Sequence, residues 1–87
     1  MLSIFGFFKN YDDGRIEVLA QETFEENPVM ERIFSDISIN SQKGVVKLEG
    51  KVDSQKIKVQ VENNIEEKLT KSRVDYDKIE NQLEVSD

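Results

Sequence analysis

The chain has 87 residues, of which 37% are apolar and 34% are charged, and its formal net charge is −6. This length allows one hydrophobic core, and the acidic balance argues against nucleic acid as a partner, because each neutralised phosphate needs a lysine or an arginine. The sequence has no cysteine and no histidine, which excludes disulfides, thiolate metal sites and histidine-based acid–base catalysis.

The first 12 residues form an apolar N-terminal segment in front of a domain expected over residues 13–87. Ile4, Phe8 and Tyr11 recur at helical spacing, which predicts a short helix, although Gly6 counts against it. Four of the seven aromatic residues lie in this segment. Three roles are open for them: packing on the domain's own core, docking on a partner or a second copy, and shallow insertion into a membrane. The membrane or partner contact would use Leu2, Phe5, Phe7, Phe8 and Tyr11.

The N-terminal segment lacks the cationic start, long apolar stretch and cleavage site of a secretory signal. We therefore expect the chain as written in the cytoplasm, and a processed form in the periplasm or at a membrane. No apolar run approaches the roughly 20 residues needed to cross a bilayer, so the sequence predicts a protein that is not transmembrane.

A helix is predicted over about residues 13–26, with Asp13 as its N-cap. The apolar face of this helix carries Ile16, Leu19, Ala20 and Phe24. The helix ends at Asn27-Pro28, because a proline ring disfavours helical backbone at the residue before it. A loop or a single turn is expected over residues 29–34.

Two strands follow, each with one apolar face. Ile37 and Ile39 alternate with polar residues in the first strand, and apolar residues alternate with charged ones over residues 46–52 in the second. The connection over residues 41–44 supplies Gly44 where a hairpin often needs a positive φ.

A long helix comes next, capped by Asp53 or Ser54. The apolar positions of this helix recur every fourth residue, at Ile57, Val61, Ile65 and Leu69. A third strand closes the chain over residues 79–85, where apolar and polar residues alternate again.

The element order is therefore αββαβ, and the fold class is α+β. Because each strand has a single apolar face, both main helices must cover the same side of a three-stranded mixed sheet, which gives a two-layer sandwich. A crossover helix joins the second and third strands and permits parallel pairing. On the solvent face this pairing would bring Lys47 and Lys51 near Glu80 and Glu84.

The order of these elements and three stretches of sequence resemble the BON domain family of bacterial periplasmic and outer-membrane-associated proteins. The stretches are residues 36–39, 45–52 and 79–85, and the resemblance covers residues 13–86. It implies a non-catalytic binding module in the bacterial cell envelope, with affinity for phospholipid or a protein partner. One departure is Asp75-Tyr76, where the family usually has Gly-Val, and it predicts a longer second helix or a polar extension through residues 71–73.

The start of the chain is similar to the opening of cytoplasmic bacterial proteins that join a BON domain to a LysM domain and bind potassium. This similarity implies an alternative function, that of a cytoplasmic potassium-responsive protein whose ion site is unknown. A further alternative is a small structural protein that forms homo-oligomers through its N-terminal aromatic residues.

No residue pattern predicts an enzyme. The Asp12-Asp13 pair and Asp75 with Asp77 are interpreted as turn and cap residues, because 18 carboxylates place some pair close together by abundance alone. No cofactor or metal site is predicted beyond the potassium alternative. Five lysines gather over residues 43–58, and we interpret them as a solvated mixed-charge face, with a weak anion-binding patch as the alternative. These lysines are Lys43, Lys47, Lys51, Lys56 and Lys58.

Overall fold

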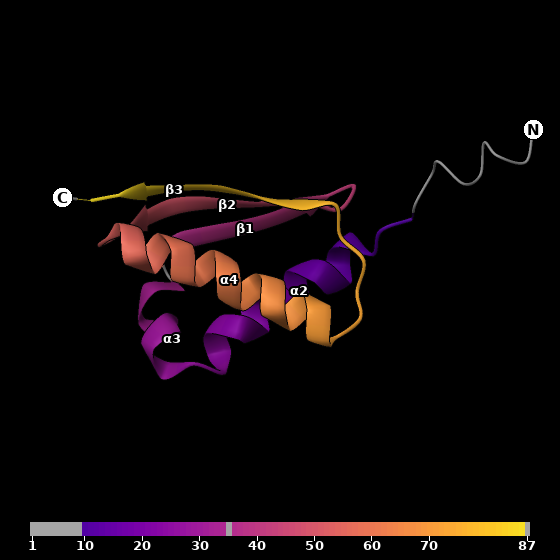
Figure 1. The fold of residues 1–87 in the computed structure, drawn as a ribbon, viewed down its shortest axis with the longest axis horizontal. Helices are drawn as coiled ribbons and strands as arrows, with labels where there is room; N and C mark the ends of the chain where they lie inside the picture. Colours follow the sequence, from indigo (N-terminus) through magenta and orange to yellow (C-terminus); the bar gives the residue numbers. More distant parts are fainter. Residues whose placement is uncertain (1–9, 35, 87) are drawn as a thin grey trace, which may run out of the picture.

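In the part of the chain that the structure describes, three helices cover one face of a three-stranded sheet and leave the other face open (Figure 1). The structure is a computed structural model that describes residues 10–34 and 36–86. Its strands lie in the order β1-β2-β3, with β1 antiparallel to β2 and β2 parallel to β3. The predicted α+β fold and its αββαβ order are therefore confirmed. The elements are α2 (Asp13–Glu25), α3 (Pro28–Phe34), β1 (Ile37–Gln42), β2 (Val45–Val52), α4 (Gln55–Lys71) and β3 (Lys78–Val85).

Helix α2 is capped one residue earlier than the sequence predicted. Asp12, not Asp13, is the N-cap, and its side chain accepts a hydrogen bond from the Arg15 N–H at 3.1 Å. The prediction for Asp13 was wrong because its carboxylate has partners on the β1–β2 hairpin, which are far away in sequence. At α4 the cap is Ser54, whose Oγ accepts from the Ile57 N–H at 3.2 Å.

Helix α3 replaces the loop or single turn that the sequence predicted over residues 29–34. Pro28 is its first residue, where the fixed φ of proline suits a helix and the missing N–H costs nothing. Asn27 precedes it and accepts from the N–H groups of Glu31, at 2.9 Å through its carbonyl, and Met30, at 3.4 Å through its side chain. The same proline that ends one helix therefore begins the next.

The β1–β2 hairpin turns through two residues with positive φ, Lys43 at 51° and Gly44 at 80°. Positive φ at both central residues defines the type I′ turn, which matches the twist of the flanking strands. The expectation of a positive φ at Gly44 is confirmed. A second close approach lies toward the far end of β2, where a Cβ on Gly50 would meet the Asp36 carbonyl oxygen.

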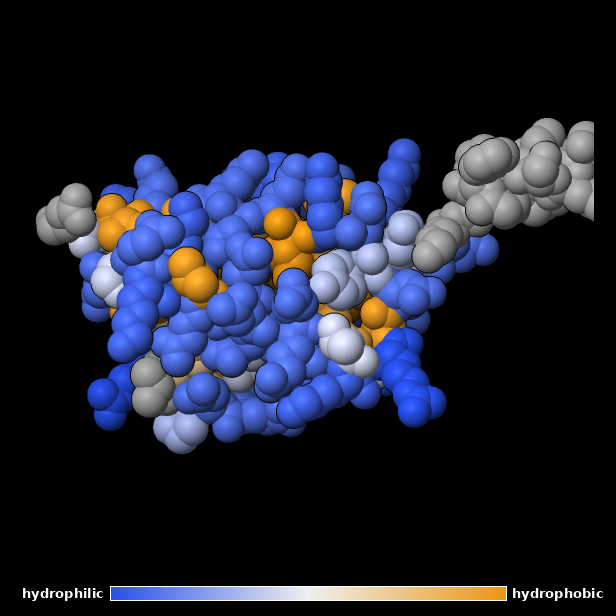
Figure 2. Space-filling model, viewed as in Figure 1, coloured by the Kyte–Doolittle hydropathy of each residue, from blue (hydrophilic) through white to orange (hydrophobic). Residues whose placement is uncertain are grey.

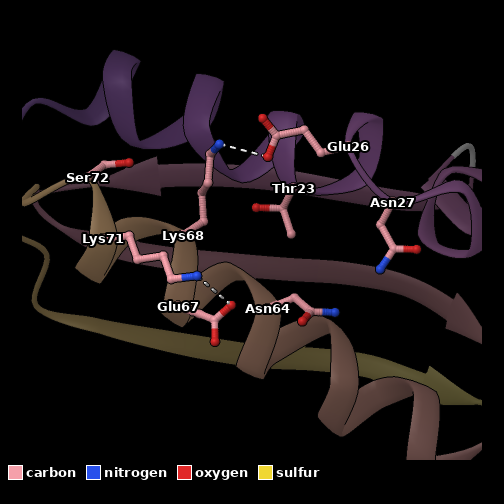
Figure 3. A pocket seen from close by; sticks show the side chains of 8 residues that line it. All are labelled: Thr23, Glu26, Asn27, Asn64, Glu67, Lys68, Lys71 and Ser72. Carbon is pink, nitrogen blue, oxygen red and sulfur yellow. Dashed lines mark hydrogen bonds and ion pairs between the residues drawn. The ribbon is translucent and has the colours of Figure 1, made fainter.

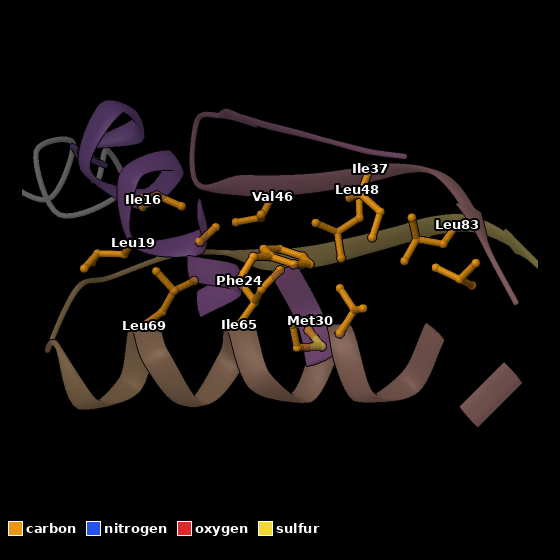
Figure 4. Packing of buried hydrophobic residues seen from close by; sticks show 13 residues of the cluster. Ile16, Leu19, Phe24, Met30, Ile37, Val46, Leu48, Ile65, Leu69 and Leu83 are labelled. Carbon is orange, nitrogen blue, oxygen red and sulfur yellow. The ribbon is translucent and has the colours of Figure 1, made fainter. Parts of the chain in front are cut away.

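The hydrophobic core fills the space between the sheet and the helices (Figure 4). Phe24 of α2 is fully buried, and it lies in the close-up between the strands and Ile65 of α4. The every-fourth-residue pattern predicted for α4 holds for its fully buried positions. The buried apolar residues are Ile16, Leu19, Ala20, Phe24, Met30, Ile37, Val46, Leu48, Val52, Val61, Ile65, Leu69 and Leu83.

The open face of the sheet is polar, and its charges alternate across the strands. The parallel register places Lys47 beside Glu80 and Lys51 beside Glu84, as the sequence predicted. Opposite charges at neighbouring positions of two strands favour the pairing. This face therefore carries a mixture of charges along most of its length.

The C-terminal end of α4 lies just before Asp75-Tyr76. The helix ends at Lys71, and Arg73 then adopts the left-handed conformation with φ 56°. The N–H of Arg73 donates to the Thr70 carbonyl and that of Val74 to the Leu69 carbonyl, at 3.1 and 3.2 Å. These two bonds form a Schellman motif, so the polar extension predicted through residues 71–73 is the closure of the helix.

Candidate functional site

One hollow surface is a groove between α2 and α4 (Figure 3), with a volume of about 280 Å³. Its lining is polar, and it comes from the C-terminal halves of both helices. The residues that line it are Thr23, Glu26, Asn27, Asn64, Glu67, Lys68, Lys71 and Ser72.

Both lysines of this groove are paired with glutamates. Lys68 Nζ lies 2.8 Å from Glu26 and 3.6 Å from Glu22, so it links α4 to α2. The hydrogen bond to Glu26, helped by both negative charges, raises the pKa of Lys68 above its ordinary value. Lys71 pairs with Glu67 of its own helix at 3.4 Å. The groove therefore contains ion pairs that link α4 to α2, and both of its lysines already have carboxylate partners.

A second hollow lies on the open face of the sheet beside the hairpin turn, and its volume is about 760 Å³. We call it the hairpin-end surface. It is lined by Asp13, Asn40, Gln42, Lys43, Val45, Lys47, Lys78 and Glu80. Among the described residues, Lys43 and Lys47 form no ion pair, while Lys78 lies 3.7 Å from Glu80. Two ammonium groups on this surface are therefore available to bind an anionic group.

Asp13 holds the hairpin turn in place beneath this surface. Its Oδ1 accepts from the Ser41 hydroxyl at 2.7 Å and the Gly44 N–H at 3.0 Å, and its Oδ2 accepts from the Lys43 N–H at 2.9 Å. These hydrogen bonds, the one from Ser41 most strongly, lower the pKa of Asp13. Glu17 adds a bond by accepting from the Ser41 N–H at 2.8 Å. The first turn of α2 therefore fixes the backbone that presents Lys43.

Tyr11 packs at the same end of the molecule. A Cβ on Gly44 would lie 2.7 Å from the Tyr11 ring, so the ring rests directly against the turn. Tyr11 is half-buried and packs on the core. The chain therefore passes from the apolar N-terminal segment into the domain beside the hairpin-end surface. Of the predicted contact residues, Leu2, Phe5, Phe7 and Phe8 lie outside the described residues, and a membrane or partner contact through any of the five stays a prediction.

The structure divides the five lysines that the sequence grouped together. Lys43 and Lys47 meet on the hairpin-end surface, whereas Lys51 lies at the other end of β2 and both remaining lysines lie on α4. Lys78 was not among the residues predicted from the sequence, and the parallel register of β3 places it opposite Val45. The predicted parallel pairing puts the third strand next to the second, but only the exact register shows that Lys78 lies beside the hairpin turn.

The rest of the described surface offers little else that is specific. The face in Figure 2 is largely hydrophilic, with apolar residues showing only in scattered small areas. Among residues 10–34 and 36–86, no group of three or more acidic side chains is placed to hold a metal ion. No helix of this part of the chain is long and apolar enough to cross a membrane.

No protein-family model matches the chain, and no curated protein matches it in sequence. The resemblance to the BON family therefore enters below as a proposal.

Proposed function

We propose that this chain is a non-catalytic binding module that attaches to a phospholipid surface through its hairpin end. Lys43 and Lys47 would contact lipid phosphates there, and the aromatic side chains of the N-terminal segment would enter the lipid beside them. Lysines at such a surface add electrostatic attraction to the energy gained by burying apolar side chains.

The observation that carries this proposal is the meeting of two features at one end of the fold. Lysines without an ion pair to any described residue line a hollow of about 760 Å³, and Tyr11, the last aromatic residue of the N-terminal segment, packs against the turn that carries one of them. The groove between α2 and α4 differs, because its lysines are paired with glutamates.

The backbone at Lys43 gives independent support. Its φ of 51° is positive, and glycine, asparagine and aspartate adopt this conformation at lower cost than lysine does. A residue that is costly for local structure suggests a role in function. A cation at the tip of the hairpin, exposed to solvent, fits a role in binding an anionic group.

The BON resemblance points in the same direction. It implies a module of the bacterial cell envelope that binds phospholipid or a protein partner, and the αββαβ order is the order on which the resemblance depends. A protein partner and a potassium response are the alternatives.

Co-sedimentation with phospholipid vesicles tests the proposal. The full chain is expected to bind vesicles of phosphatidylcholine with phosphatidylglycerol. The variant K43Q/K47Q is expected to bind roughly ten- to thirty-fold more weakly, because each lysine near such a surface contributes about 1 kcal/mol. K51Q/K56Q is the matched control, since it removes the same charge from solvent-exposed lysines elsewhere, and it should bind as the full chain does, to within about two-fold.

A separate variant tests the role of the N-terminal aromatic residues. Replacing Phe5 and Phe8 with serine should weaken vesicle binding by at least about ten-fold, because burying one phenylalanine side chain is worth about 1.5–3 kcal/mol. If the full chain fails to sediment with these mixed vesicles, the phospholipid proposal is wrong. A melting temperature that differs between potassium and sodium chloride at equal ionic strength would then favour the potassium alternative.

A further inference from the structure

Strand β3 is an edge of the sheet among the described residues. The N–H groups of Lys78 and Ser86 donate toward β2, to the carbonyls of Gly44 and Val52. Because successive backbone groups of a strand point to opposite sides, the odd-numbered N–H groups from Ile79 to Val85 point away from β2. An edge of this kind is a template for pairing with another chain.

The side chain of Asn81 closes the middle of this edge. Its Oδ1 accepts from the Leu83 N–H at 3.2 Å. Its Nδ2 donates to the Lys58 carbonyl at 2.9 Å and to Glu62 Oε1 at 3.1 Å, both on α4. Because the Leu83 N–H is already bonded to Asn81, a second strand would have to displace the Asn81 side chain to bond this N–H. Asn81 thus ties β3 to α4 and occupies an outward donor of the edge.

The sequence of β3 is complementary to itself in one antiparallel register. With Asn81 at the centre, Ile79 faces Leu83 of the second copy, and Lys78 faces Glu84 of the second copy. Each contact occurs twice because of the two-fold symmetry. In this register the apolar sides of both strands stay on the same side of the joined sheet, and the charged pairs have opposite signs.

We propose that β3 is a docking strand for a second copy of this chain, and that the side chain of Asn81 latches the strand shut in the single copy. When Asn81 swings away, the Leu83 N–H exchanges the Asn81 side chain for the Ile79 carbonyl of the second copy. The two sheets then join into one of six strands. This inference rests on contacts of β3 and α4, and it is independent of the proposed function.

Sedimentation equilibrium of the full chain and its variants tests the latch. N81A should dimerise at least about ten-fold more tightly than the unchanged chain. Adding E84K should weaken the N81A dimer, because the lysine introduced at position 84 would face Lys78 of the second copy, and adding K78E as well should restore it. N81A/E49K is the matched control, since Glu49 lies on the same face of the neighbouring strand and its change in charge is equal. It should leave the dimer unchanged.

Three results would overturn the proposal. The first is an N81A chain that is folded by circular dichroism and stays a monomer at every concentration reached. The second is an N81A dimer that E84K and E49K weaken equally, and the third is a dimer that K78E fails to restore. If N81A does not fold, N81T removes the same hydrogen bonds while suiting a strand better, and the same outcomes apply to it.

Discussion

In the groove between α2 and α4, Lys68 and Lys71 lie 2.8 and 3.4 Å from glutamates. On the hairpin-end surface, Lys43 and Lys47 form no ion pair among the described residues, although Lys47 lies beside Glu80 in the register of the sheet. Both regions are hollow, polar and rich in lysine. A paired lysine stabilises the fold weakly and offers little to a ligand. An unpaired lysine beside a hollow contributes less to the stability of the fold, and its charge remains available to a ligand.

The two regions also differ in how their backbone is held. The groove lies between regular helices, while the hairpin-end surface depends on a turn with positive φ that Asp13 fixes through three hydrogen bonds. The groove is therefore held by side-chain ion pairs, and the hairpin-end surface by hydrogen bonds to the backbone of a turn.

The largest effect is expected at Gly44. Gly44→Ala should destabilise the fold by about 2–4 kcal/mol, because its methyl group would meet the Tyr11 ring and alanine disfavours the φ of 80°. Urea unfolding measures the change. Gly14→Ala is the control, since the nearest atom to its Cβ is 3.8 Å away, and it should stabilise α2 by up to about 1 kcal/mol. Equal effects at both glycines would show that Tyr11 does not pack against the turn.

Lys43→Asn is expected to have opposite effects on stability and on binding. Asparagine tolerates a positive φ better, so the free energy of unfolding should rise by about 0.5–1 kcal/mol, while vesicle binding weakens. Arg73→Asn is the matched control, because Arg73 has a similar φ of 56° and the same charge but lies outside the hairpin-end surface. It should stabilise the fold equally and leave binding unchanged. Weaker binding in both variants would remove the special role of Lys43.

The hydrogen bonds of Asp13 predict a dependence of stability on acid. Because the folded pKa of Asp13 lies below its ordinary value of 3.8, its contribution is fully present above that value and is lost as the pH falls through the folded pKa. Asp13→Asn should lower the melting temperature near neutral pH and flatten the loss of stability in acid. Thermal unfolding followed from pH 7 into acid measures both. A D13N variant with the same acid profile as the unchanged chain would contradict this role.

Lys68 should give the smallest effect of the four. Its pKa is raised by Glu26 and Glu22, so its contribution is present below the ordinary value and is lost as the pH rises through the folded pKa. Because this lysine is close to solvent, Lys68→Met should lower the melting temperature only slightly and leave vesicle binding unchanged. Added salt should shrink the difference between the two chains. A large loss of vesicle binding in Lys68→Met would show that the groove, and not the hairpin-end surface, binds phospholipid.

Local patterns were enough to predict most of the fold. Alternation predicted the strands, and the spacing of Val61, Ile65 and Leu69 predicted α4, because each pattern depends on neighbours within a few residues. Helix α3 was not predicted, because Asn27-Pro28 is a stop signal for the preceding helix as well as a suitable start for the next one.

The candidate site was less predictable because its parts are distant in sequence. Asp13 meets Ser41 across 28 positions, and its local setting favours the simpler role of a helix cap. Lys78 joins Lys43 through the register of a parallel pair, which alternation alone does not fix. Asn81 looked like an ordinary polar position of a strand, because its partners on α4 come from packing.

We propose that the hairpin end, rather than the groove, contacts a phospholipid surface. We would test it first by recording amide-resolved NMR spectra of the full chain with and without phospholipid bicelles. We expect shifts or broadening over residues 2–11, 40–47 and 78–80, with residues 64–72 unchanged. Shifts confined to the groove, or no shift anywhere in the chain, would contradict it.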